Sequence, residues 1–94
     1  MRFTITLEGE TRDIIERLDG EFLIDSTTSW SNFKLLEYLD PYGDTIFNCK
    51  QIDDLIIDLR KLNEMYNNTI IKQIIALAER CKKEVHTYLC FNGD

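Results

Sequence analysis

The sequence is poor in the residues that loosen a fold, with one proline and four glycines among 94 residues. Disordered and low-complexity chains are rich in such residues, so this composition excludes both classes. Long apolar runs are also missing, because no stretch approaches the roughly 18 consecutive apolar residues that a membrane span needs. We therefore expect no membrane partner.

Cysteine and histidine are scarce as well. The three cysteines, Cys49, Cys81 and Cys90, are odd in number and widely spaced, which argues against a disulfide framework. We expect Cys81, on a predicted helix, and Cys90, on a predicted strand, to be buried free thiols. The cysteines and the only histidine, His86, lack the close pairs of a zinc motif, so we expect no metal and no cofactor.

The beginning of the sequence bears on the compartment. Acidic residues appear by Glu8, so no apolar signal-peptide core follows Arg2. This pattern, together with unpaired cysteines, predicts a cytoplasmic protein. A chain of this length with 44% hydrophobic residues can build one core without metal or disulfide, and we expect residues 1–94 to form a single domain.

The charge is unevenly distributed along the chain. Residues 1–58 carry 13 Asp and Glu against 5 Lys and Arg, which is −8, and residues 59–94 carry 4 against 6, which is +2, giving the total of −6. An acidic surface steers basic partners and repels nucleic acid. The basic residues Arg80, Lys82 and Lys83 end a predicted helix, where they complement its dipole, so we expect no direct binding of nucleic acid.

Strands dominate the prediction for the first 32 residues. Alternating apolar and polar residues predict a strand over residues 2–8, ended by Gly9. Residues 11–19 favour a short helix, from the spacing of their apolar residues, although Asp19-Gly20 is equally compatible with a hairpin turn between two strands. Residues 22–24 predict a short strand, and residues 25–32 a polar loop.

The middle of the chain predicts a β-hairpin. Residues 33–39 read as one strand and residues 45–47 as its partner. Between them lies a turn in which Pro41 fixes φ, Asp40 can accept a backbone hydrogen bond and Gly43 permits a positive φ.

Two helices and a last strand complete the prediction. Asn48 and Gln51 resemble a capping box, and apolar residues then recur at helical spacing over about 49–66 and 68–83. A short connection makes the helices an antiparallel pair. Residues 85–91 predict a strand that is apolar on both faces. The fold class is therefore α+β, a largely antiparallel sheet with the helix pair on one face.

No catalytic set emerges from the residue pattern. His86 and Cys90 share one strand face at roughly 13 Å, too far apart for a hydrogen bond, so we favour a structural histidine that is hydrogen-bonded near the sheet surface. A small ligand-binding domain or enzyme remains an alternative if Tyr42, Asp44 and His86 meet in one pocket. The many carboxylates carry little information in an acidic chain.

The acidic N-terminal stretch is the strongest functional signal. Seven acidic residues lie between Glu8 and Asp25, and Trp30 follows in the polar loop. The plain interpretation is a solvated surface that gives solubility, with Trp30 filling the core. The functional one is an electrostatic footprint for a basic protein, with an aromatic anchor. Its predicted contacts are Glu8, Glu10, Asp13, Glu16, Glu21, Asp25 and Trp30.

Two segments resemble a family of small uncharacterised bacterial proteins. One is Asp40–Asn48 (DPYGDTIFN) with Gln51, and the other is His86–Leu89 (HTYL) with Phe91, Gly93 and Asp94. The resemblance covers about the second half of the chain and places Asn48 and Gln51 at a helix start. The family has no established activity, so it implies no catalytic residue. In size and charge the chain is similar to immunity proteins that neutralise bacterial toxins, whose toxin-facing surface is commonly the variable part.

These observations predict a non-enzymatic, protein-binding inhibitor of the immunity type, which neutralises a basic bacterial toxin such as a nuclease through its acidic surface. The alternative is a structural, self-associating domain that forms a homodimer through an unpaired edge strand.

Overall fold

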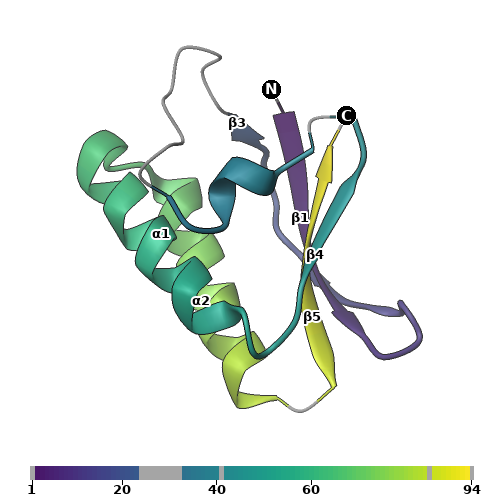
Figure 1. The fold of residues 1–94 in the computed structure, drawn as a ribbon. Coiled ribbons are helices and arrows are strands. Elements are labelled where there is room, and N and C mark those ends of the chain that lie inside the picture. The colour runs from purple at the N-terminus through teal and green to yellow at the C-terminus, as the bar shows by residue number, and fades with distance from the viewer. Residues whose placement is uncertain (1, 24–32, 41, 85, 94) are drawn as a thin grey trace.

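Two helices cover one face of an antiparallel sheet in the computed structural model, which describes residues 2–23, 33–40, 42–84 and 86–93 (Figure 1). The predicted α+β class, with a helix pair on one face of the sheet, is confirmed. The elements in chain order are β1 (Arg2–Gly9), β2 (Ile14–Arg17), β3 (Phe22–Leu23), the 3-10 helix η1 (Leu36–Tyr38), β4 (Asp44–Phe47), α1 (Ile52–Tyr66), α2 (Thr69–Lys83) and β5 (Thr87–Gly93).

The sheet has the order β2-β1-β5-β4, so the first and last strands of the chain lie at its centre. β1 pairs with β5 from Phe3↔Gly93 to Gly9↔Thr87, and β4 pairs with β5 on the far side. This central position of β5 confirms the prediction of a last strand inside the sheet. β2 and β3 both pair with β1, and together with the connecting residues 18–21 we call them the interrupted edge.

The helix predicted over residues 11–19 is wrong, because this segment contains the edge strand β2. Ile14 and Ile15 are exposed, so their helical spacing does not mark a buried helix face. One edge of β1 has backbone N–H and C=O groups that β5 does not bond. The short segment with Ile14 and Ile15 follows β1 after a tight turn, and it satisfies its own backbone hydrogen bonds by pairing with that edge. Asp19-Gly20 does connect two strands, but both of them pair with β1 rather than with each other.

The strand predicted over residues 33–39 is also wrong, and so is its hairpin with residues 45–47. This segment carries η1, in which Leu36 is buried, and Phe33 is buried just before it. The backbone N–H groups of Lys34, Leu35 and Leu36 bond to the buried Asp58 carboxylate of α1 instead of a strand. β4 is real, and its partner is β5.

The helix pair follows the prediction closely. Asn48 Oδ1 accepts hydrogen bonds from the Lys50 and Gln51 N–H groups, and Gln51 Oε1 accepts one from the Asn48 N–H, which confirms the capping box. Regular α-helix begins at Ile52, one turn later than expected. Asn67 has a left-handed φ of 44°, and the Asn68 side chain caps α2 by accepting from the Ile70 N–H.

The core lies between the helices and the sheet. Phe3, Ile5 and Leu7 of β1 alternate toward it, and they meet Leu89 and Phe91 of β5. Phe91 makes edge-to-face contacts with three other phenylalanines, Phe3, Phe22 and Phe47. Cys81 and Cys90 are buried, as predicted, and Cys49 is exposed.

Candidate functional site

The turn between β1 and β2 is tight and built around Gly9. The Gly9 N–H bonds to Asp13 O at 2.8 Å, and the Arg12 N–H bonds to Gly9 O at 3.0 Å. A Cβ at position 9 would lie 2.5 Å from the Asp13 carboxylate, so a larger residue there would displace the Asp13 side chain. Arg12 has a left-handed φ of 68°, which sends its side chain back over the sheet face that the helices leave open.

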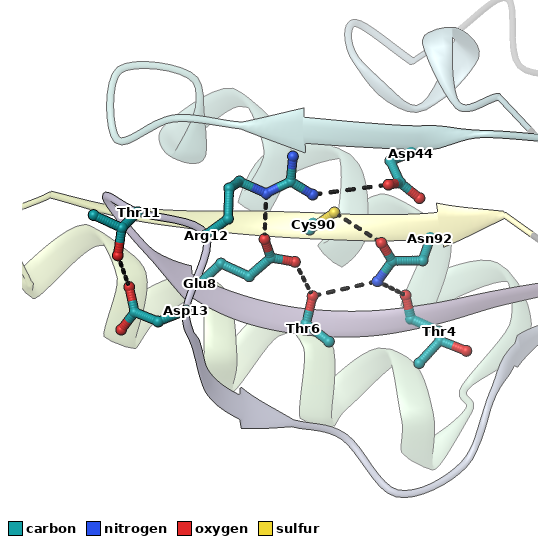
Figure 2. A network of polar contacts seen from close by, with 9 residues as sticks. All are labelled: Thr4, Thr6, Glu8, Thr11, Arg12, Asp13, Asp44, Cys90 and Asn92. Atoms are coloured by element: carbon teal, nitrogen blue, oxygen red, sulfur yellow. Dashed lines mark hydrogen bonds and ion pairs between the residues drawn. The ribbon is translucent and has the colours of Figure 1, made fainter.

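A polar network covers this open face (Figure 2). Arg12 Nε donates to Glu8 Oε1 at 2.6 Å, and Thr6 Oγ1 donates to Glu8 Oε2 at 2.7 Å. The Asn92 side chain donates to Thr6 Oγ1 and accepts from the Cys90 thiol. Donors and acceptors thus match along one chain of bonds that joins β1 to β5, which is how buried polar groups are satisfied.

Arg12 carries this network toward the sheet's other edge. Its second guanidinium nitrogen lies 3.7 Å from Asp44 of β4, on the far side of β5. Cys90 and Thr6 are buried, and Glu8 is only 5% exposed. The network thus holds three neighbouring strands together and leaves little of the Glu8 carboxylate for a partner.

Burial would raise the pKa of Glu8, but the hydrogen bond from Thr6 and the guanidinium of Arg12 outweigh it and lower that pKa below its ordinary value. Burial also raises the pKa of Cys90 to about 12, with the nearby negative charges of Glu8 and Asp44 adding to the rise. Glu8 is therefore ionised and Cys90 is a neutral thiol near pH 7. This arrangement suits a structural role for Cys90, because the nucleophilic form of cysteine is the thiolate.

The described residues among those predicted to contact a partner fall into three groups. Glu8 is buried under Arg12, as described above. Glu16 and Glu21 are partly exposed and ion-paired, Glu16 with Arg80 at 2.9 Å and Glu21 with Arg2 at 2.7 Å. Glu10 and Asp13 are exposed in the turn between β1 and β2. Asp25 and Trp30 lie outside the described residues.

The exposed acidic residues follow the interrupted edge rather than spreading over one face. Glu10 and Asp13 lie at the turn that leads into it, Glu16 is on β2, Asp19 follows β2, and Glu21 precedes β3. Arg12 is the first basic residue in this stretch, and its charge is directed inward to Glu8. Arg17 is the other, and it lies on β2 itself. One edge of the sheet is therefore predominantly acidic.

A groove of about 420 Å³ lies beneath this edge, between β2 and α2. Sequence reasoning missed it, because only the tertiary fold brings residues 16–19 against the helix. The Arg80 guanidinium sits in the groove between two carboxylates, Glu16 and Glu84, each at 2.9 Å. The groove is lined by Glu16, Arg17, Leu18 and Asp19 from the edge and by Gln73, Ala76, Leu77 and Arg80 from α2.

His86 is not the hydrogen-bonded sheet histidine that the sequence predicted. It is exposed, has a left-handed φ of 63° and precedes β5, with its Nδ1 atom 4.0 Å from Glu10. A second pocket of about 300 Å³ is lined by His86 together with Cys49, Lys50 and Tyr88. The sequence showed no sign of this juxtaposition, because it depends on the pairing of Phe47 with Leu89 between β4 and β5.

The pocket imagined for Tyr42, Asp44 and His86 does not form. Asp44 pairs with Asn92 near one end of β5, whereas His86 precedes the other end, roughly 20 Å away at strand spacing. Tyr42 is 90% exposed. The three residues therefore do not form the site that a ligand-binding or enzymatic function would have used.

Within the described ranges, no three His, Cys, Asp or Glu side chains are grouped so that they could hold a metal ion. Neither of the described α-helices is long and apolar enough to cross a membrane. No protein-family model matches the sequence, and no curated protein or solved structure is significantly similar to it. The resemblance of the two segments to a family of small bacterial proteins thus stays a prediction.

Proposed function

We propose that this protein is a non-catalytic, protein-binding inhibitor of the immunity type, which binds a basic protein such as a nuclease toxin through the acidic edge of its sheet. The observation that carries the proposal is the run of acidic residues Glu10, Asp13, Glu16, Asp19 and Glu21 along the exposed interrupted edge. Complementary charge at such a surface speeds association and selects the partner.

A pair of charge reversals tests this surface. Glu10→Lys with Asp19→Lys removes two exposed carboxylates, one in the turn before β2 and one just after β2, without breaking an Arg ion pair. Glu37→Lys with Glu64→Lys makes the same change in net charge at exposed residues of η1 and α1, away from the edge. Asp13 is left unchanged, because its carboxylate accepts the Thr11 hydroxyl hydrogen bond within the turn.

The measurement begins with capture of the partner from the source cell's lysate at low and at high salt, followed by mass spectrometry. The Kd of the retained basic protein is then measured against salt concentration. We expect the edge pair to weaken binding at least about tenfold and to flatten the salt dependence, and the control pair to change little. Equal effects of the two pairs, or none from the edge pair, would refute the acidic edge as the binding surface.

A homodimer is the second candidate function, and the opposite edge of the sheet favours it. The Gly93 N–H bonds to Gly43 O, so the alternation of the antiparallel ladder turns the backbone groups of Asp44 and Ile46 away from β5. If β4 pairs with β4 of a second copy about a twofold axis at Thr45, Asp44 lies opposite Ile46 of the other copy. Thr45 then lies opposite Thr45, and no like charges face each other. Sedimentation that shows a monomer at all concentrations would exclude this function.

A further inference from the structure

The backbone of β2 is ready to accept another strand. Leu18 N–H bonds to Ile5 O at 3.0 Å, and the next pair along the ladder is Arg17 with Thr6. Because bonded and non-bonded pairs alternate in an antiparallel ladder, the N–H and C=O of Arg17 point away from β1. All four β2 side chains are exposed, so no described segment covers this edge.

The groove lies on the helix side of this open edge. Glu16 and Leu18 stand opposite Leu7 and Ile5, whose side chains point to the helices, so Glu16 and Leu18 point that way too. Neighbouring strands of a sheet share this alternation. A strand added next to Arg17 would therefore send the two residues flanking its paired residue into the groove between β2 and α2.

The charged residues of β2 and of the groove indicate the chemistry of the strand that can bind there. A second copy of this chain is disfavoured, since a twofold axis at Arg17 or at Glu16 would set two like charges directly opposite each other, which destabilises a sheet. An axis at Ile15 would fall on the register shift between Glu16 and Ile14, where the ladder with β1 is irregular. Glu16 and Asp19 line the groove together with Arg17 and Arg80, and Glu84 pairs with Arg80 beside it. Three carboxylates thus face two guanidinium groups, which leaves an excess of one negative charge. A lysine or arginine from the partner would add the missing positive charge, with its apolar stem over Leu18 and Ala76.

We infer that the basic partner docks by strand addition: an extended segment of it pairs with β2 at Arg17 and places basic side chains in the groove between β2 and α2. This inference rests on the proposed function, since it names the way in which the acidic edge binds. It assigns separate roles to the two parts of the surface. The backbone of β2 supplies the hydrogen bonds, and Glu16 and Asp19 select positive side chains.

The test uses a synthetic probe, a ten-residue peptide of alternating lysine and valine with blocked ends. Its control is the same peptide N-methylated at alternate residues, which keeps the charge but cannot complete the ladder. Binding is followed by amide chemical shifts of the full chain. We expect the unmethylated peptide to bind, to slow exchange of the Arg17 amide at least about tenfold, and to lose at least about tenfold in affinity on methylation.

Two variants of Arg17 distinguish the contribution of its backbone N–H to peptide binding from that of its charge. Arg17→Pro removes the outward N–H without removing a bond to β1, because proline is tolerated where an edge N–H faces solvent. Arg17→Gln removes only the charge. We expect Arg17→Pro to abolish peptide binding, and Arg17→Gln to bind at least as well as the wild type. A thermal melt checks that Arg17→Pro folds, and the methylated peptide tests the same bond on the wild-type protein.

Strand addition is overturned if the methylated peptide binds as tightly as its parent, if a folded Arg17→Pro binds normally, or if no shift appears at millimolar peptide. The proposed function has a separate outcome. If the captured basic protein loses affinity for Glu10→Lys with Asp19→Lys but not for Arg17→Pro, the acidic edge still binds it and only the docking mode is wrong.

Discussion

The carboxylate of Asp58, wholly buried on α1, accepts the Leu35 N–H at 2.7 Å and so ties η1 to a helix that begins 16 residues later in the chain. The same carboxylate accepts the N–H groups of Lys34 and Leu36 at 3.1 Å each. Three backbone donors at the start of a short helix would otherwise be unsatisfied inside the protein. The Asp58 side chain thus holds the backbone of residues 34–36 in a turn that leads into η1, and not in an extended strand.

Replacing Asp58 by alanine should destabilise the protein by about 2–4 kcal/mol, because three partly buried N–H groups lose a charged acceptor. The free energy of unfolding from urea titration measures this loss. Asp53→Ala is the matched control, since Asp53 is an exposed acid on the same helix, and it should cost less than about 1 kcal/mol. Similar losses for both variants would contradict the anchoring role of Asp58.

Glu8 should make stability depend on pH in the acid range. Its pKa is lowered in the folded state by Thr6 and Arg12 despite burial, so its contribution is complete above the unfolded pKa of about 4.3 and disappears as pH falls through the folded pKa. Glu8→Gln should lower the free energy of unfolding by about 1–2 kcal/mol at pH 7. The loss is no larger because Arg12 is half-exposed and solvent screens its charge.

Thermal melts of the wild type and Glu8→Gln between pH 7 and pH 2 check this prediction. The two Tm values should converge at the acid end, where Glu8 is protonated. Glu21→Gln serves as the control, because Glu21 forms an exposed ion pair with Arg2. A Tm difference for Glu8→Gln that stays constant down to pH 2 would show that the charge of Glu8 does not stabilise the fold.

The three cysteines should differ sharply in reactivity. Cys49 is exposed, whereas Cys81 and Cys90 are buried and burial raises the pKa of both thiols, to about 12 for Cys90. A thiol reagent at pH 8 should therefore modify one cysteine per native chain and all three in denaturant. Intact-mass measurement counts the adducts, and Cys49→Ser should leave the native chain unmodified. Rapid labelling of Cys90 in the native state would contradict its place beneath Arg12.

Gly20 should be hard to replace, because it has a φ of +98° in the break between β2 and β3. Gly20→Ala forces a Cβ into a conformation that suits glycine and should cost about 1–2 kcal/mol of stability. The adjacent variant Asp19→Ala removes an exposed side chain and should cost less than about 0.5 kcal/mol. Equal urea midpoints for both variants would refute a strained position at Gly20.

Periodicity was a sound guide where one face of an element is buried over a long span. The apolar stripe from Ile52 to Leu62 and the alternation of β1 both survive in the structure, and the capping box at Asn48 forms in the turn that leads into α1. Short segments were harder to predict. Residues 14–18 have too few apolar positions to distinguish a helix face from an edge strand, and their pairing with β1 decided it.

The candidate site was visible in the sequence only as an excess of acid. Glu8 looked like any exposed polar residue of an alternating strand, and its burial depends on Arg12 folding over the open face of the sheet. Arg80 looked like a helix-ending charge, and its contact with Glu16 spans 64 residues of sequence. Neither contact follows from local spacing, because both join residues that only strand pairing and helix packing bring together.

The amino-acid sequence by itself determined the α+β class, the antiparallel helix pair, the inner position of the last strand and the acidic character of the N-terminal half. These properties depend on local periodicity, capping and composition, which act within one or two turns of chain. Only the tertiary structure decided which acids are exposed, where the sheet has a free edge and that a groove lies beneath it. Those features depend on which strands pair and on which distant side chains neutralise one another, and long-range packing sets both.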